Sequence, residues 1–228
     1  ASQMSVMRSS LIGGLVANVV TNLKRKQNRV RVFETGRCFF RDKQGSPIDG
    51  FRQPWKLAGL AYGSALPEQW GSPSRNVDFF DIKGEVELLF APAKACFEKA
   101  THPALHPGRS ARLSVNGQIV GFVGELHPQW LQKYGLPMAP VVFELDLDAL
   151  EFAKLPKFLE VSRLPPAVRD LAIVVDQQLE LQQLLDGIAA NRPAIIQDIR
   201  LFDVYTGNGV APGEKSLAFR IVMQDTQR

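Results

Sequence analysis

Two alternating segments joined by Asn116-Gly117 limit the folds that are open to this chain. Apolar and polar residues alternate on both sides of the dipeptide, in ARLSVNGQIVGFVGEL. Such alternation is typical of strands with one buried face, and Asn-Gly supplies the two positive-φ residues of a tight turn. Residues 111–126 therefore predict a β-hairpin, and we expect an antiparallel sheet to be built around it.

The segments around this hairpin predict helices and further strands. Apolar residues recur every four positions from Leu11 to Leu23, which is typical of the buried face of a helix. Residues 77–91 also have helical spacing, and HPQWLQKYG has Pro128 in its first turn and Gly135 at its end. Further strands are predicted in RVRVFETG, RCFFRD, WKLAGLAYG and APVVFELDL. Residues 1–152 should form one antiparallel sheet with flanking helices.

A domain boundary is expected at residues 153–166. The segment LPKFLEVSRLPPAVRD contains three prolines and little periodicity, which favours a linker. Residues 167–228 then have the order strand, helix, strand, strand, which opens a split βαβ, ferredoxin-like domain. A complete domain of this type needs one more helix and strand. We therefore expect an α+β chain whose second domain is truncated at its C-terminus, and which is itself a fragment.

The composition argues against a membrane protein, a disulfide-stabilised protein and a metal-binding protein. The sequence has no run of about 18 apolar residues, so no membrane helix is expected. Cys38 and Cys96 are the only cysteines and lie far apart in the sequence, which favours reduced thiols in a cytosolic protein. The three histidines have no metal-ligand spacing with one another or with cysteine. We expect no metal site, and a structural role for each histidine.

The net charge of +4 is concentrated near the N-terminus. Residues 1–45 contain nine Lys or Arg against two acidic residues, whereas residues 163–228 contain seven against eight. A basic cluster such as NLKRKQNRVR can bind nucleic-acid phosphates, or it can be the solvated end of a helix, where cations suit the dipole. The run is short and interrupted, which favours the second interpretation.

A glycine-rich loop lies between two apolar segments in RLFDVYTGNGVAPGEKSLAFRI, residues 200–221. A phosphate-binding loop joins a strand to a helix, so that the helix N-terminus faces the anion. After this loop, however, Leu217, Phe219 and Ile221 alternate with small or polar residues, as in a strand. The stretch therefore predicts a hairpin and no phosphate cradle.

The same alternation predicts an open face in residues 167–228. We expect the outward residues to include Ala172, Asp203, Tyr205 and Ser216, with Phe202 and Val204 packed inward. The parity of Ile199 and Leu201 conflicts with this pattern unless a β-bulge intervenes. Single-stranded RNA binders stack an exposed ring on an unpaired base and read the base edge with short polar groups. The alternative is that Tyr205 only anchors the hairpin.

The whole chain resembles the beta subunit of bacterial phenylalanyl-tRNA synthetases. Its last third resembles the C-terminal anticodon-binding domain, in Arg169-Asp170, Phe202-Asp203-x-Tyr205 and Gly213-x-Lys215-Ser216-Leu217-Ala218. Five earlier segments are similar to the catalytic-like module of that subunit: MRSSLIGGLVANVVTN, QNRVRVFETGRCF, DFFDIKGEVE, HPGRSARL and GFVGELHP. The resemblance implies a class II synthetase-like antiparallel sheet, followed by the ferredoxin-like domain.

The resemblance also implies partners and a site. In this family the beta subunit pairs with a catalytic alpha subunit, as two alpha and two beta chains, and acts on tRNA-Phe in the cytoplasm. ATP and magnesium serve the whole enzyme, and no cofactor is expected in this fragment. The residues that would receive the anticodon base are Ala172, Asp203, Tyr205 and Ser216. The family's editing and metal-binding modules would lie earlier in the full subunit.

Residues 1–152 lack the class II catalytic motifs. The second motif has an Arg two residues before a Glu on a strand, and the matching positions are Val32 and Glu34. The third motif, a glycine-spaced run that ends in Arg, has no counterpart. We therefore expect no catalytic residue here, and a scaffold for the alpha subunit.

Two other functions stay open at this point. One is a free-standing enzyme around His106 and Arg109, although nothing nearby in the sequence supplies a nucleophile paired with a base. The other is a protein-interaction module without RNA contact. The slightly acidic balance of residues 163–228 favours this second alternative, since phosphate binding needs more Lys and Arg.

Overall fold

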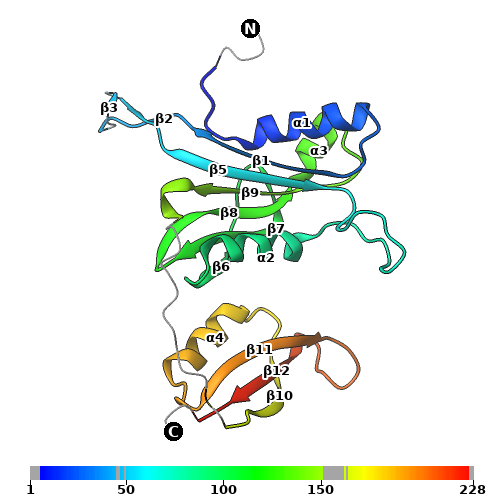
Figure 1. Cartoon of the computed structure of the whole chain (residues 1–228), viewed down its shortest axis with the longest axis vertical. Coiled ribbons are helices and arrows are strands. Elements are labelled where there is room, and N and C mark those ends of the chain that lie inside the picture. The colour runs from blue at the N-terminus through cyan, green and yellow to red at the C-terminus, as the bar shows by residue number, and fades with distance from the viewer. Residues whose placement is uncertain (1–5, 45–46, 49, 151–161, 163, 226–228) are drawn as a thin grey trace. The chain divides into compact units, whose positions relative to one another are not determined.

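The computed structural model describes residues 6–44, 47–48, 50–150, 162 and 164–225. The chain divides into two compact units, residues 1–153 and 154–228 (Figure 1). Of the predicted linker, residues 153–161 and 163 lie outside the described residues.

A six-stranded antiparallel sheet forms the centre of the first unit, in the order β1-β5-β9-β8-β7-β6. Its strands are β1 (Val30–Arg37), β5 (Trp55–Tyr62), β6 (Ala95–Lys99), β7 (Leu105–Val115), β8 (Gln118–Leu126) and β9 (Val141–Asp146). The predicted hairpin is confirmed as β7 and β8, and Asn116 and Gly117 have φ values of 52° and 77°. The edge strand β6 was not expected from the sequence.

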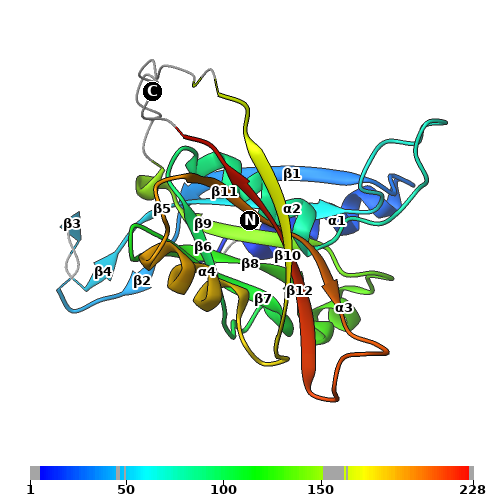
Figure 2. The ribbon, with the colours of Figure 1, turned by 90° about the horizontal axis from the view of Figure 1, so that it is seen from below.

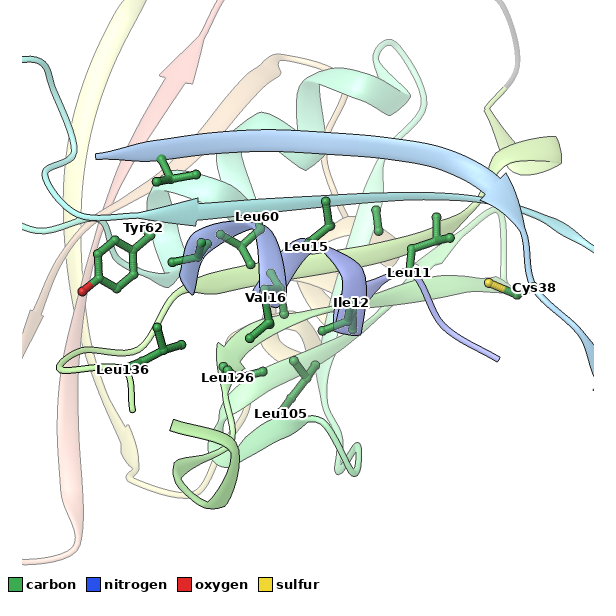
Figure 3. Close-up of a cluster of buried hydrophobic side chains, with 14 residues drawn as sticks. Leu11, Ile12, Leu15, Val16, Cys38, Leu60, Tyr62, Leu105, Leu126 and Leu136 are labelled. Carbon is green, nitrogen blue, oxygen red and sulfur yellow. The ribbon is translucent and has the colours of Figure 1, made fainter. Parts of the chain in front are cut away.

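Helices cover both faces of this sheet (Figure 1). The helices α1 (Ile12–Lys24) and α3 (Pro128–Tyr134) pack on one face, and α2 (Phe79–Phe90) packs on the other. Strand β5 alternates between them, since Leu60 joins the cluster under α1 whereas Leu57 joins the cluster under α2. Figure 3 shows the first cluster, with Leu15 and Val16 of α1 beside Leu60. Burial on both faces explains the almost continuous apolar sequence of β5.

Capping residues set the ends of α2 and α3. The Asp78 carboxylate accepts hydrogen bonds from the backbone amides of Phe80 and Asp81, and the Asp81 carboxylate accepts one from the Asp78 amide, which is a capping box. In α3, Pro128 occupies the first turn, and Gly135 ends the helix with φ of 63°. Both helices were predicted from the sequence, and both are present.

Short elements complete the first unit. Three strands of two residues each form a small antiparallel sheet in the order β2-β4-β3. These are β2 (Phe40–Arg41), β3 (Pro47–Ile48) and β4 (Phe51–Arg52), and a 3₁₀ turn, η2 (Leu147–Ala149), follows β9. Only β2 was predicted, because two-residue strands leave almost no pattern in a sequence.

The second unit has the predicted order of strand, helix, strand and strand. Its elements are β10 (Ala167–Asp176), α4 (Leu181–Ala190), β11 (Ile196–Tyr205) and β12 (Glu214–Met223). The three strands form an antiparallel sheet in the order β10-β12-β11, and α4 lies against one face of it (Figure 1). Leu217 and Phe219 of the central strand are each 2% exposed, so the core of this unit lies between them and α4. Figure 2, seen from below, shows β10 and β12 side by side, with α4 to their left.

Candidate nucleic-acid interface

The four residues predicted to form the site lie in two neighbouring rows of paired residues across the three-stranded sheet. We call each such row a rung. One rung is Ala172–Ala218–Asp203, and the next is Val174–Ser216–Tyr205. Directly paired residues of antiparallel strands point to the same face, with Cβ atoms about 4.5–5.5 Å apart. The predicted side chains therefore lie together on one face, although they come from three strands.

This face is the one that α4 leaves open. Leu217 lies between Ser216 and Ala218 on β12 and is buried, so its two neighbours point the opposite way. Tyr205 is 46% exposed, Ala172 and Asp203 are exposed, and Ser216 is half-buried. Solvent, or a partner, thus has access to all four side chains.

A β-bulge at Phe202 resolves the conflict in the alternation of β11. The pairing shifts between Leu201 and Asp203, so both Leu201 and Val204 face the core side while Asp203 faces out. The prediction that Phe202 packs inward is wrong. The ring is 52% exposed and lies under the guanidinium of Arg220, whose pairing with Asp170 places it on the open face.

Val204 has the predicted direction but is not buried. Its cross-strand partner is the buried Leu217, and yet Val204 is 52% exposed. Within the described residues nothing covers this end of β11. The sequence pattern predicts the direction of the side chain correctly but not its burial.

Tyr205 is held in place by the glycine-rich loop. Its hydroxyl donates a hydrogen bond to the carbonyl oxygen of Asn208 at 3.3 Å. The ring also lies against Gly207, where an added Cβ would come within 2.6 Å of the tyrosine oxygen. The loop then leads into β12 and not into a helix, which agrees with the predicted hairpin. Tyr205 is therefore a fixed ring that still offers almost half of its surface.

Two ion pairs flank the open face. Arg220 donates two hydrogen bonds, both of 2.9 Å, to the two carboxylate oxygens of Asp170, and this lowers the pKa of Asp170. Arg200 pairs with Asp198. Within the described part of the chain, the Asp203 carboxylate has neither an ion-pair nor a hydrogen-bond partner, and so its oxygens are available as acceptors.

Phe202 was not assigned to the site from the sequence. The signal was present as the parity conflict at Ile199 and Leu201, but a single sequence does not show which residue is the extra one in a bulge. The contact of the ring with Arg220 depends on that choice, and so it was missed as well.

The three histidines of the first unit have local structural roles. The Nδ1 atoms of His102, His106 and His127 each accept a hydrogen bond from a backbone amide two residues later, at 3.2, 3.0 and 3.1 Å. Burial lowers the pKa of His102. Arg109, the proposed neighbour of His106 in a catalytic site, pairs with Glu125 at 2.8 Å. These contacts give no support to the alternative of an enzyme at this position.

A cavity of about 590 Å³ lies beside α1, and its charged side chains are already engaged. Lys56 pairs with Asp146 at 2.6 Å. Glu144 accepts hydrogen bonds from the Ser10 hydroxyl and the Leu11 amide, at 2.8 and 2.7 Å. Among the described residues, no group of three or more His, Cys, Asp or Glu side chains is placed to hold a metal ion. The same residues include no helix long and apolar enough to cross a membrane.

Two arginines of the N-terminal basic cluster have structural partners. Arg29 donates to the carbonyl oxygens of Ser64 and Ala65, at 3.2 and 3.3 Å. Arg31 donates to the Ala65 carbonyl at 3.0 Å, and burial lowers its pKa. These two arginines hold the loop at Ser64 and Ala65 against β1. Their role is therefore structural, and it does not require nucleic acid.

Comparison with known proteins assigns both units. The family model of the phenylalanyl tRNA synthetase beta chain CLM domain matches residues 1–147. The chain belongs to this phenylalanyl-tRNA synthetase beta chain family. A second family model, the ferredoxin-fold anticodon binding domain, matches residues 162–228 and so contains the two rungs. The resemblance to the beta chain family and the ferredoxin-like fold, both predicted from the sequence, are confirmed.

Beta chain relatives match along the whole length of this chain. The phenylalanine–tRNA ligase beta subunit of Dechloromonas aromatica is 63% identical over 228 residues, and that of Aromatoleum aromaticum is 56% identical over 228 residues. Each alignment covers 100% of this chain but only 29% of the relative. The chain thus spans less than a third of the length of these beta subunits. A solved pyrrolysyl-tRNA synthetase from Desulfitobacterium hafniense is 12% identical to this chain, with a TM-score of 0.45. The alignment covers 63% of this chain and 48% of the synthetase chain.

Proposed function

We propose that this chain acts as part of a cytoplasmic phenylalanine–tRNA ligase beta subunit, in which it binds the anticodon of tRNA-Phe and supports the catalytic alpha subunit. The observation that carries the proposal is the open face of the second unit. It presents an exposed ring, a hydroxyl and a carboxylate without a partner among the described residues, on two adjacent rungs within the region that matches the anticodon-binding family. A base-binding surface on RNA-binding sheets has the same components.

Each side chain has a defined part in this proposal. The Tyr205 ring stacks on an unpaired base, and its loop keeps the ring from collapsing onto the sheet. Asp203 accepts hydrogen bonds from the base edge, and the Ser216 hydroxyl donates or accepts. Ala172 and its partner Ala218 are small, so a base can approach the sheet closely between the polar groups.

The first unit supports the alpha subunit in this proposal. It exposes large apolar side chains, among them Phe33 (76%), Phe80 (74%) and Leu88 (76%). A groove of about 380 Å³ runs between β1 and α2, and Phe33 and Leu89 line it. Exposed apolar surface of this kind marks docking sites in soluble proteins. A pair of alpha and a pair of beta chains is the assembly that we propose for the whole enzyme.

The adenylate chemistry belongs to the alpha subunit in this proposal. The position that would carry the phosphate-binding Arg is Val32, whose side chain packs against the apolar cluster under α1. Glu34, two residues later, pairs with Arg8. This face of the strand is therefore already used for packing and for an ion pair. ATP and magnesium act in the whole enzyme, at groups outside this chain.

Replacement of Tyr205 in the full enzyme tests the proposal. Tyr205→Ala should weaken tRNA-Phe binding by roughly 1–3 kcal/mol, the usual contribution of a base–aromatic stack. Tyr205→Phe should keep most of the affinity because the ring remains. The loss should appear in tRNA charging, whereas phenylalanine-dependent ATP–pyrophosphate exchange should stay unchanged. If folded Tyr205→Ala enzyme charges tRNA-Phe like the wild type, the ring is a hairpin anchor, and the interaction module without RNA contact becomes the better assignment.

A further inference from the structure

The open face extends beyond the two rungs of the proposed anticodon site. The next rung along the sheet is Asp170–Arg220–Arg200, and the Phe202 bulge lies beside it on β11. The Arg220 guanidinium carbon is 5.2 Å from the centroid of the Phe202 ring. We call Arg220 and Phe202 together the Arg–Phe platform. About half of each side chain is exposed, 53% for Arg220 and 52% for Phe202.

The fold fixes the geometry of this platform. Asp170 accepts hydrogen bonds from Nε and Nη2 of Arg220, and such bidentate pairing sets the plane of a guanidinium. On the other strand, the bulge turns the Phe202 ring out of the core and toward that plane. The Nη1 group of Arg220 has no hydrogen-bond partner among the residues described. A planar cation, a ring and a free donor are therefore held together at the surface.

The platform borders the proposed base site. Arg220 is two residues from Ala218 on β12, a separation of about 6.8 Å along a strand. Phe202 precedes Asp203 directly in the chain. A base bound on the first two rungs would thus have its neighbour in the same RNA strand within reach of the platform.

We propose that the Arg–Phe platform is a second stacking surface, which binds the anticodon nucleotide next to the one that stacks on Tyr205. This inference rests on the proposed anticodon-binding function. Unpaired bases stack on aromatic rings and on the planes of arginine guanidinium groups, and the platform offers both. The Nη1 group of Arg220, which has no hydrogen-bond partner among the described residues, donates to an acceptor on the same base.

The ion pair with Asp170 distinguishes this role from a phosphate clamp. An arginine that binds a phosphate releases a counterion, and its loss lowers the salt dependence of binding by about one unit of slope. The charge of Arg220 is already balanced by Asp170, so its contribution should come from stacking and should depend little on salt. The salt slope of RNA binding therefore separates the two roles.

The test uses the complete enzyme, with variants in the full beta subunit assembled with its alpha partner. The probes are a synthetic anticodon stem-loop of tRNA-Phe and three versions of it, each lacking one anticodon base. Phe202→Leu keeps an apolar side chain without the ring, and Arg220→Gln removes the planar cation. The matched control is Arg169→Gln. Arg169 is an exposed arginine next to Asp170 on β10, and its side chain points to the opposite face of the sheet.

Phe202→Leu and Arg220→Gln should each weaken stem-loop binding about tenfold. The salt slope of binding should not change in either variant. The control Arg169→Gln should bind like the wild type. The effect should disappear with one base-deleted probe. That probe should differ from the one with which Tyr205→Ala loses its effect. The two platform variants together should cost less than the product of their separate effects, because both remove the same stack.

Asp170→Asn separates this role from a purely structural ion pair. The substitution removes the charge of the pair, but the amide oxygen of Asn still accepts one hydrogen bond from Arg220, so the guanidinium and the ring stay in place. We expect it to lower the thermal stability of the second unit as much as Arg220→Gln, while RNA affinity stays within about threefold of the wild type. Equal losses of affinity in Asp170→Asn and Arg220→Gln would overturn the platform, and so would a reduced salt slope in Arg220→Gln.

The outcomes also separate this inference from the proposal on which it rests. If Tyr205→Ala weakens binding while Phe202→Leu binds like the wild type, the platform is wrong and the anticodon site stands. If neither variant changes stem-loop binding, the anticodon function of this face is itself wrong, and the platform is wrong with it.

Discussion

Tyr205 illustrates how one side chain can be fixed by its own loop and remain available to a partner. The hydroxyl binds the Asn208 carbonyl and the ring lies against Gly207, yet 46% of the residue is exposed. From the sequence, a hairpin anchor and a stacking ring were alternative roles for Tyr205. At the scale of the residue they are compatible, because a ring that is already ordered loses little conformational entropy when a base stacks on it.

Asp203 should control which base is accepted more than how tightly RNA is bound. A carboxylate can only accept hydrogen bonds and repels phosphate, so its benefit comes from donors on a base edge. Asp203→Asn adds a donor to the same position, and it should relax discrimination among tRNA-Phe transcripts with a changed anticodon base. Charging efficiency on these transcripts is the measurement, and Asp186→Asn on α4 is a matched control. A uniform loss on all transcripts, without a change in their ranking, would contradict this role.

At the scale of the element, the start of α2 is a pH-sensitive cap. The Arg75 guanidinium donates to both oxygens of Asp81, at 2.6 and 2.7 Å, and holds the pKa of that carboxyl at about 2, below the model-compound value of 3.8. The folded-state pKa is thus lower than the unfolded one. The stabilisation is therefore complete above about pH 4 and is lost as the pH falls through about 2.

The cap can be tested by acid unfolding. Asp81→Asn should cost about 1 kcal/mol at neutral pH, as the loss of a capping side chain does. Below pH 4 the wild type should lose stability more steeply than the variant, because only the wild type has this carboxylate to protonate. Thermal unfolding between pH 5 and 2, followed by circular dichroism, compares them. Parallel curves at all pH values would show that Asp81 does not contribute in this way.

Elements with local signals were predicted, and elements that depend on distant partners were not. One or two residues are enough to predict the turn at Asn116-Gly117 and the two ends of α3, at Pro128 and Gly135. The structure contains all three features. Strand β6 is short, lacks alternation and exists through its pairing with β7, which no local pattern reveals. The bulge in β11 lies between these cases. The conflict in the alternation indicated that a bulge was needed, but it did not show that Phe202 would point outward.

At the scale of the whole molecule, the two units divide the proposed work. The first has Val32 at the position of the Arg in the second class II motif, and the second carries the face that we propose binds RNA. Purified chain without alpha subunit should therefore show no phenylalanine-dependent ATP–pyrophosphate exchange, since Val32 replaces the Arg that would neutralise a phosphate of ATP. The positive control is the enzyme assembled with its alpha partner. Exchange by the chain alone would refute the scaffold role of the first unit.

The two rungs of the open face have a consequence for genetics. Their residues come from three strands, so the site exists only while β10 and β11 both pair with β12. The proposed recognition of RNA and the folding of this unit are then a single event, and damage to its core removes the face without touching any residue on it. Cells that carry temperature-sensitive alleles at buried positions of this unit should therefore accumulate uncharged tRNA at the restrictive temperature. These cells should respond as they do to phenylalanine starvation.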